Sequence, residues 1–246
     1  MSDTATQPDA AAAGRFTFPG TSISVSRMGY GAMQLAGLHV FGEPRDPEEA
    51  KAVLQEARQL GIDHIDTCDF YGPHVTNRLI RETLHPYGAD LTIVTKIGAY
   101  RDETGGWVLQ RDADFLRRSI EDNLRNLGLD RIAIVNLRMG GPEDDVAAPM
   151  EAMRRMQEEG LLEHIGISTV DERQLATARE IAPIVCMQNH YNLVHRADDA
   201  MIDALAADGI AYVPYFPLGG FTPLQADRLT TVATSMGETS QAVALA

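Results

Sequence analysis

Several short apolar segments of this chain end in a polar residue that could take part in chemistry. These residues are Asp66, Lys96, Arg138, Ser168, Thr169, Gln188, Asn189 and Tyr215. If the segments are parallel strands, their carboxyl ends meet at one edge of the sheet, where catalytic and binding groups gather. The set is rich in proton-transfer and hydrogen-bonding groups, and we therefore expect one active site built from it.

The residues most able to transfer a proton are Asp66, Tyr71 and Lys96. An ammonium beside a tyrosine stabilises the phenolate, so we expect the pKa of Tyr71 to fall from its ordinary value of about 10 towards the range useful for acid catalysis. Asp66 would hold Lys96 charged and in place. The alternative is an ion pair between neighbouring strands with a purely structural role.

The elements that position these residues alternate between short β-rich runs and helical runs, which predicts a parallel sheet wound with helices. The strands are expected at 27–31, 62–66, 91–96, 131–138, 164–169, 184–189 and 210–216, and the helices at 47–61, 76–84, 113–128, 146–160, 171–182, 197–209 and 240–246. A Rossmann sheet would usually show G-x-G-x-x-G between its first strand and helix, and here only Gly29 and Gly31 appear, as GYG, so a (β/α)8 barrel is favoured.

The two ends of the sequence lead to further expectations. Residues 1–14 resemble a disordered tail, 15–25 a β-hairpin covering the base of the barrel, and 15–246 a single barrel domain. Seven strands leave an eightfold barrel without its last strand and helix. We therefore expect the natural protein to continue for about 30 to 40 residues, because an open barrel exposes unpaired backbone groups.

Composition excludes several classes of protein. The chain has 44% hydrophobic residues and a formal net charge of −14, which argues against a nucleic-acid or anionic-membrane partner. No segment is long and apolar enough to span a bilayer. Two cysteines, Cys68 and Cys186, cannot make a disulfide framework, so a reducing cytoplasm is expected. Composition does not predict an oligomeric state.

Five motifs follow one another at the predicted strand ends. They are DTCDFYG at 66–72, TKIG at 95–98, GIST at 166–169, MQNHYN at 187–192 and YFPLGG at 215–220. In order and spacing they resemble the aldo-keto reductase family, and the likeness runs from about residue 25 to 246. The longer strings GYGAMQLAG and DFYGPHVTN resemble the bacterial branch of that family that reduces pyridoxal.

The resemblance implies NADPH-dependent reduction of a small aldehyde or ketone, pyridoxal being the candidate substrate. Tyr71 would then give a proton to the carbonyl oxygen, Lys96 would lower the pKa of Tyr71, and Asp66 would partner Lys96. The cofactor-binding residues that it implies are Gly31, Ala32, Met33, Ser168, Thr169, Gln188, Tyr215, Phe216, Leu218 and Gly220. Among these, Ser168 and Gln188 would hold the nicotinamide carboxamide, and Tyr215 would stack on its ring.

The chain departs from the family pattern at Arg138, where the family usually has His. Strand alternation places Asn136 and Arg138 on one face, directed into the barrel mouth. A guanidinium keeps its proton, so we expect Arg138 to bind an oxyanion or phosphate rather than relay a proton, the alternative being a solvated cation at the rim. The family's eighth strand and helix, which grip the 2′-phosphate of NADPH, are also missing.

Other candidate residues carry less weight. His64 lacks the further ligands of a barrel metal site, so we expect no metal, and Cys68 is expected to fill space. Met33, Gln34 and Trp107 could line a substrate pocket or simply pack. Two other functions stay open: a non-catalytic NADP-binding regulatory protein on the same fold, and a Schiff-base aldolase that uses Lys96 as nucleophile.

Overall fold

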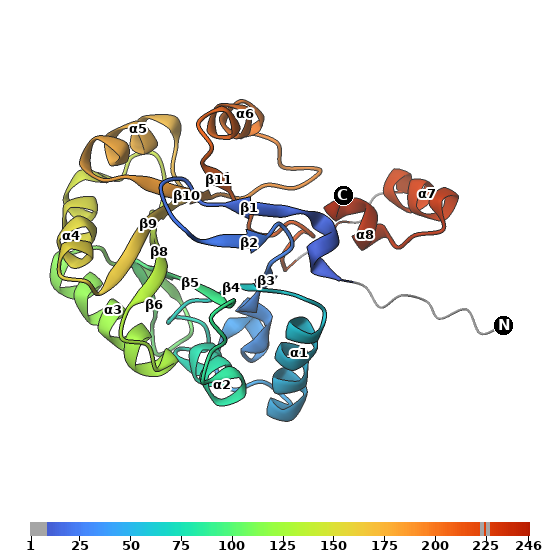
Figure 1. Cartoon of the computed structure of the whole chain (residues 1–246), viewed down its shortest axis with the longest axis horizontal. Coiled ribbons are helices and arrows are strands. Elements are labelled where there is room, and N and C mark those ends of the chain that lie inside the picture. The colour runs from blue at the N-terminus through green and yellow to red at the C-terminus, as the bar shows by residue number, and fades with distance from the viewer. Residues whose placement is uncertain (1–8, 222–223, 225–226) are drawn as a thin grey trace.

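The computed structural model describes residues 9–221, 224 and 227–246, and its centre is a curled sheet of seven parallel strands (Figure 1). Their order across the sheet is β11-β10-β9-β8-β5-β4-β3. The strands are β3 (Tyr30–Gly31), β4 (His64–Asp66), β5 (Thr92–Ile97), β8 (Ile132–Arg138), β9 (Leu162–Ser168), β10 (Ile184–Gln188) and β11 (Ala211–Tyr212). The predicted wound parallel sheet is confirmed. Within the described residues, β3 and β11 are its two edges.

Helices α1 to α6 follow one another around the outside of the sheet, as Figure 1 shows. Aspartates cap three of them, since Asp46, Asp112 and Asp171 accept hydrogen bonds from the first-turn amides of α1, α3 and α5. The helices are α1 (Pro47–Gln59), α2 (Val75–Leu84), α3 (Ala113–Leu127), α4 (Ala147–Glu158), α5 (Glu172–Ile181), α6 (Asp199–Ala207), α7 (Asp227–Met236) and α8 (Ser240–Leu245). Helix α7 was not expected from the sequence.

Four clusters of buried apolar residues pack around the sheet, and two of them hold β8 in place. Val135 and Leu137 of β8 face outward and pack with side chains of α3, α4 and α5, such as Leu116 and Met150. Ile134 faces the interior with residues of β5 and β10. A strand buried on both faces shows the nearly continuous apolar run that β8 has.

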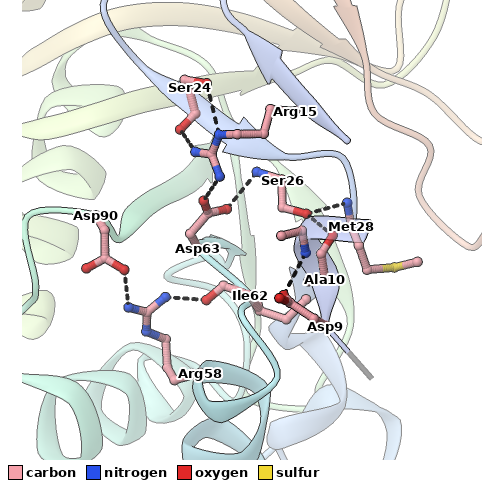
Figure 2. Close-up of polar contacts among 11 residues, drawn as sticks. Asp9, Ala10, Arg15, Ser24, Ser26, Met28, Arg58, Ile62, Asp63 and Asp90 are labelled. Carbon is pink, nitrogen blue, oxygen red and sulfur yellow. Dashed lines mark hydrogen bonds and ion pairs between the residues drawn. The ribbon is translucent and has the colours of Figure 1, made fainter. Parts of the chain in front are cut away.

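The N-terminal hairpin packs against the interior core of the sheet. Strands β1 (Arg15–Thr17) and β2 (Ser24–Ser26) pair antiparallel, and Phe18 and Val25 pack with Val94 and Ile134. The hairpin is fixed from outside by Asp63, which pairs with Arg15 at 2.9 Å and accepts from the Ser26 amide at 2.8 Å (Figure 2). The predicted hairpin is therefore present, at the base of the sheet.

The chain is ordered earlier than the expected boundary at residue 15. Residues Ala10–Ala13 form a 3-10 helix, η1. The Ala10 amide donates to the Leu60 carbonyl at 2.7 Å, and the Ser26 hydroxyl donates to the Ala10 carbonyl at 2.6 Å. These bonds satisfy backbone groups that an unstructured tail would leave to water. Residues 1–8 of the expected tail lie outside the described residues.

Loops at the carboxyl ends of the strands complete the framework of the site. After β3 the chain makes two 3-10 turns, η2 (Ala32–Leu35) and η3 (Leu38–Val40), and after β5 it makes a second hairpin of β6 (Ala99–Arg101) and β7 (Trp107–Leu109). This second hairpin was not expected. No helix in the described part of the chain is both long and apolar enough to cross a membrane.

Candidate active site

A buried ion pair lies at the carboxyl end of β4 and β5. The Lys96 ammonium donates to Asp66 Oδ2 at 2.6 Å and to the Thr67 carbonyl at 2.9 Å. Gln188, at the end of β10, donates to the other Asp66 oxygen at 3.0 Å. Burial opposes a charge on Lys96, yet the Asp66 carboxylate and its hydrogen bond outweigh burial and raise the pKa of the ammonium. Lys96 is therefore a cation that is fixed in position, and Asp66 is its counter-ion.

Tyr71 lies in the loop after β4 and is only 6% exposed. The Lys96 ammonium is 5.1 Å from the centre of the Tyr71 ring. Burial raises the pKa of Tyr71 to about 12, and the nearby Lys96 cation lowers it only in part. The expectation of a lowered pKa is therefore wrong, because removal of the phenol from water outweighs the ammonium. At neutral pH Tyr71 keeps its proton.

Arg138 and Ser168 end two neighbouring strands and lie opposite each other in register. The Arg138 guanidinium is 5.3 Å from the centre of the Tyr215 ring, and no carboxylate of the described residues lies within 4.0 Å of it. Within the described part of the chain, the Ser168 hydroxyl has one polar contact, with the Thr169 hydroxyl at 3.5 Å. Asn136 points inward on the same face, where its Oδ1 accepts from the Cys186 thiol at 3.3 Å.

These groups surround a cleft of about 240 Å³. Its polar wall consists of Tyr71, Lys96, Arg138 and Ser168, and aromatic and apolar side chains make the rest. The apolar lining residues are Met33, Phe70, Ala99, Trp107, Leu109, Tyr215, Phe216 and Phe221. Of the three expected pocket residues, Met33 and Trp107 line the cleft and Gln34 is exposed outside it.

The other residues expected to bind cofactor lie around the cleft rather than on its wall. Gly31 is level with Asp66 in the sheet, and Ala32 is buried behind it. Thr169 has a left-handed backbone (φ 60°), and its hydroxyl is 3.5 Å from the Tyr215 hydroxyl. Leu218 and Gly220 belong to the loop after β11. A side chain at Gly220 would meet the Phe216 ring at 2.5 Å, so glycine leaves room for that ring.

The sequence did not single out His190 or most of the β6–β7 hairpin. The His190 ring stacks on Tyr215, with centroids 5.5 Å apart and planes at 10°. The hairpin had a signal, since the turn-forming run DETGG at 102–106 separates two short β-type runs. Gly98, the residue before β6, has φ 115° and lies close to the end of β8. A Cβ at this position would be 2.6 Å from the Arg138 carbonyl oxygen, so glycine is needed there.

The arrangement can perform one kind of chemistry well. A neutral phenol next to a fixed ammonium can give up a proton and then be stabilised as phenolate. A nearby guanidinium can bind a developing oxyanion, and the aromatic and apolar walls lower the local dielectric, which strengthens both interactions. The cleft is thus suited to protonating an oxygen that gains negative charge during the reaction.

Comparison with known proteins agrees with this geometry. A relative from Escherichia coli named pyridoxine 4-dehydrogenase is 58% identical over 94% of this chain and 82% of its own length. An aldo-keto reductase of Schizosaccharomyces pombe, with NADP(+) in its name, is 27% identical over 80% of this chain and 59% of its own. A thermostable aldo-keto reductase solved with the inhibitor epalrestat superposes with a TM-score of 0.79 at 26% identity, over 94% of this chain and 83% of that one.

The same comparison identifies the family directly. The model of the aldo/keto reductase family matches residues 27–244, which include every strand of the seven-stranded sheet and every residue of the cleft. The solved relative shares the curled parallel sheet and surrounding helices, which confirms the expected barrel-type fold. The chain therefore belongs to the aldo/keto reductase family.

Proposed function

We propose that this protein reduces the carbonyl group of a small aldehyde with NADPH, and that pyridoxal is a substrate. The observation that carries the proposal is the Asp66–Lys96 ion pair held beside the neutral phenol of Tyr71 in an apolar cleft. The name of the E. coli relative supports the choice of pyridoxal. The two cysteines are buried free thiols, which suits a reducing cytoplasm as its location.

The residues present fit a nicotinamide cofactor. Ser168 is fully buried, yet among the described residues its hydroxyl has a single polar contact, at 3.5 Å, so it can donate a hydrogen bond to a carboxamide. Gln188 supplies an amide at the same level, and the Tyr215 ring lines the cleft beside them. NADPH, when bound there, supplies the hydride for the carbonyl carbon.

The proton reaches the carbonyl oxygen from Tyr71. With a pKa of about 12 the phenol is protonated at every physiological pH, and an alkoxide is a stronger base than a phenolate, so the transfer is favourable. The Lys96 ammonium stabilises the phenolate that remains, and Asp66 keeps Lys96 charged. Arg138 donates to the oxygen as its charge grows, without giving up a proton.

The same geometry weighs against a Schiff-base aldolase. A lysine attacks a carbonyl only as a neutral amine, and lysines used in this way have depressed pKa values. Here the pKa of Lys96 is raised and its ammonium is bonded to Asp66 and to the Thr67 carbonyl. Lys96 is arranged to stay charged.

The experiment is pyridoxal-dependent oxidation of NADPH by the purified chain, compared with Tyr71→Phe. We expect the variant to lose at least about a hundredfold in kcat with nearly unchanged NADPH binding, because only the proton donor is removed. For the unmodified protein, kcat should show no fall attributable to Tyr71 between about pH 6 and about pH 9. Equal turnover by Tyr71→Phe contradicts the role of Tyr71. Binding of NADPH without turnover of any aldehyde by the wild-type protein would instead support a non-catalytic regulatory protein.

A further inference from the structure

Arg101, at the end of β6, is a buried cation that the proposed reaction does not use. It is 7% exposed, and no carboxylate of the described residues lies within ion-pair distance of it. Its guanidinium donates instead to three backbone carbonyls. The bonds are to Gly105 at 2.6 and 3.0 Å, to Val40 at 2.8 Å and to His39 at 3.1 Å. Such charge-assisted bonds are stronger than those between neutral groups.

Two of these carbonyls belong to a strained turn. His39 and Val40 are consecutive residues with left-handed backbones, at φ 57° and 61°. This conformation is unfavourable for residues with a side chain, and most of all for a β-branched one such as Val40. The Val40 carbonyl also accepts from the amide of Gly72, the residue after Tyr71, at 3.2 Å. The turn is thus held by bonds from two sides.

The hydrogen bond to the third carbonyl and the stacking of the guanidinium on Trp107 fix the β6–β7 hairpin. Gly105 lies in its turn, and the Arg101 guanidinium carbon is 3.9 Å from the centre of the Trp107 ring. The edge of Trp107 then packs against Phe70, with centroids 5.6 Å apart. Trp107 and Phe70 both line the cleft, although Trp107 is 49% exposed, and Trp107 is also the register partner of Arg101 in the hairpin.

We propose that Arg101 is a positioning residue that joins the His39–Val40 turn to the β6–β7 hairpin and holds Trp107 as the aromatic wall of the cleft. Its planar fork serves both purposes at once, because the edges of the guanidinium bond to carbonyls while its face stacks on the indole. The wall favours aromatic aldehydes over short aliphatic ones. That selectivity rests on the proposed carbonyl reduction, whereas the placement of Trp107 does not.

The placement can be tested without cofactor or substrate, because Trp107 is the single tryptophan of the chain. We expect Arg101→Met to shift the tryptophan emission to longer wavelength and to increase its quenching by acrylamide, as the indole becomes more exposed. Arg101→Lys, which keeps the charge but loses the fork, should show the same changes in smaller degree and gives an answer if Arg101→Met does not fold.

Arg58 offers a matched control on the far side of the molecule. It too donates to a backbone carbonyl, that of Ile62, and it pairs with Asp90 at 2.6 Å (Figure 2). Arg58→Met should lower the melting temperature and leave tryptophan emission and quenching unchanged. If Arg101→Met and Arg101→Lys both keep the wild-type emission and quenching, the positioning role is wrong.

The selectivity is tested with benzaldehyde and propionaldehyde as probes. In Arg101→Met we expect the ratio of kcat/KM for benzaldehyde to that for propionaldehyde to fall by about tenfold, mainly through a higher KM for benzaldehyde. An equal loss for both aldehydes would overturn the selectivity. If the wild-type chain reduces neither these aldehydes nor pyridoxal, the proposed function fails, and the emission measurement still decides the role of Arg101.

Discussion

Gly166→Ala is expected to destabilise the interior of the sheet beneath the ion pair. Gly166 lies in β9, in register with Asn136 of β8 and Cys186 of β10. A Cβ added at Gly166 would be 2.0 Å from Asn136 Oδ1 and 2.6 Å from Cys186 Sγ. Both neighbours are buried, and Asn136 is also the register partner of Lys96. A single methyl group therefore collides with two fixed side chains directly under the cleft.

The expected loss in the free energy of unfolding follows from the lack of space around Gly166. Overpacking of a close-packed core typically costs about 1 to 3 kcal/mol, and two contacts below 3.0 Å at fully buried atoms place Gly166→Ala near about 3 kcal/mol. Asn136→Ala removes the side chain with the shorter contact. It also removes a buried amide nitrogen that has no hydrogen-bond partner, which offsets part of the cost of the cavity. The two substitutions should thus couple favourably by about 2 kcal/mol.

The assay is a double-mutant cycle of the free energy of unfolding, measured with urea for the wild type, both single variants and the pair. Gly31→Ala is the matched control, because Gly31 also lies in the sheet but has nothing within 4 Å of its added Cβ. It should change stability by less than about 0.5 kcal/mol. Additive effects of Gly166→Ala and Asn136→Ala would refute the steric reasoning, as would a Gly166→Ala variant as stable as Gly31→Ala.

Two further predictions concern charge. Burial raises the pKa of Asp69 to about 7, whereas an aspartate in the unfolded chain has a pKa of about 3.9. Between these two pH values the folded protein binds a proton that the unfolded chain does not bind. The free energy of unfolding therefore falls as pH rises through that window. Asp69→Asn should lessen the fall in melting temperature between about pH 5 and about pH 8, and an unchanged fall would contradict this. Arg138→Met should lower kcat/KM for both pyridoxal and benzaldehyde by about tenfold to a hundredfold, because the proposed donation from Arg138 is to the carbonyl oxygen that both aldehydes have. Unchanged kcat/KM for both aldehydes would contradict that role of Arg138.

Much of the fold could be predicted because its strands and helices have strong local signals. The run IAIVNLR is apolar on both faces because β8 is covered on both faces, and Gly128 follows α3 in the left-handed conformation that ends many helices. The β6–β7 hairpin was missed although its turn run DETGG at 102–106 was a signal, because its strands have three residues each and lie outside the repeating strand–helix pattern. Helix α7 was missed as well.

The site was harder to predict than the fold, because its properties depend on distance and burial rather than on residue type. Asp66, Tyr71 and Lys96 were expected at one mouth, and the parallel sheet brings them together. The direction of the Tyr71 pKa was not predictable, since it depends on whether burial or the Lys96 charge is the larger effect. Arg101 gave no signal, because its partners are the backbones of a turn some 60 residues earlier and of its own hairpin.

The charges of the cleft explain how a chain with a net charge of −14 can attract an anionic cofactor. The charges of Lys96 and Asp66 cancel at 2.6 Å, so the pair contributes little field beyond itself. Among the described residues, Arg138 is a cation at the mouth that has the Tyr215 ring beside it and no carboxylate within 4.0 Å. A lone charge between apolar walls interacts through a lower dielectric than charges in water do. The solvated carboxylates of the outer surface are in water, and salt screens their field within about 10 Å. The local field at the cleft is therefore positive although the molecule as a whole is negative, and Arg138 supplies it where the family usually has a histidine, which is largely neutral at physiological pH.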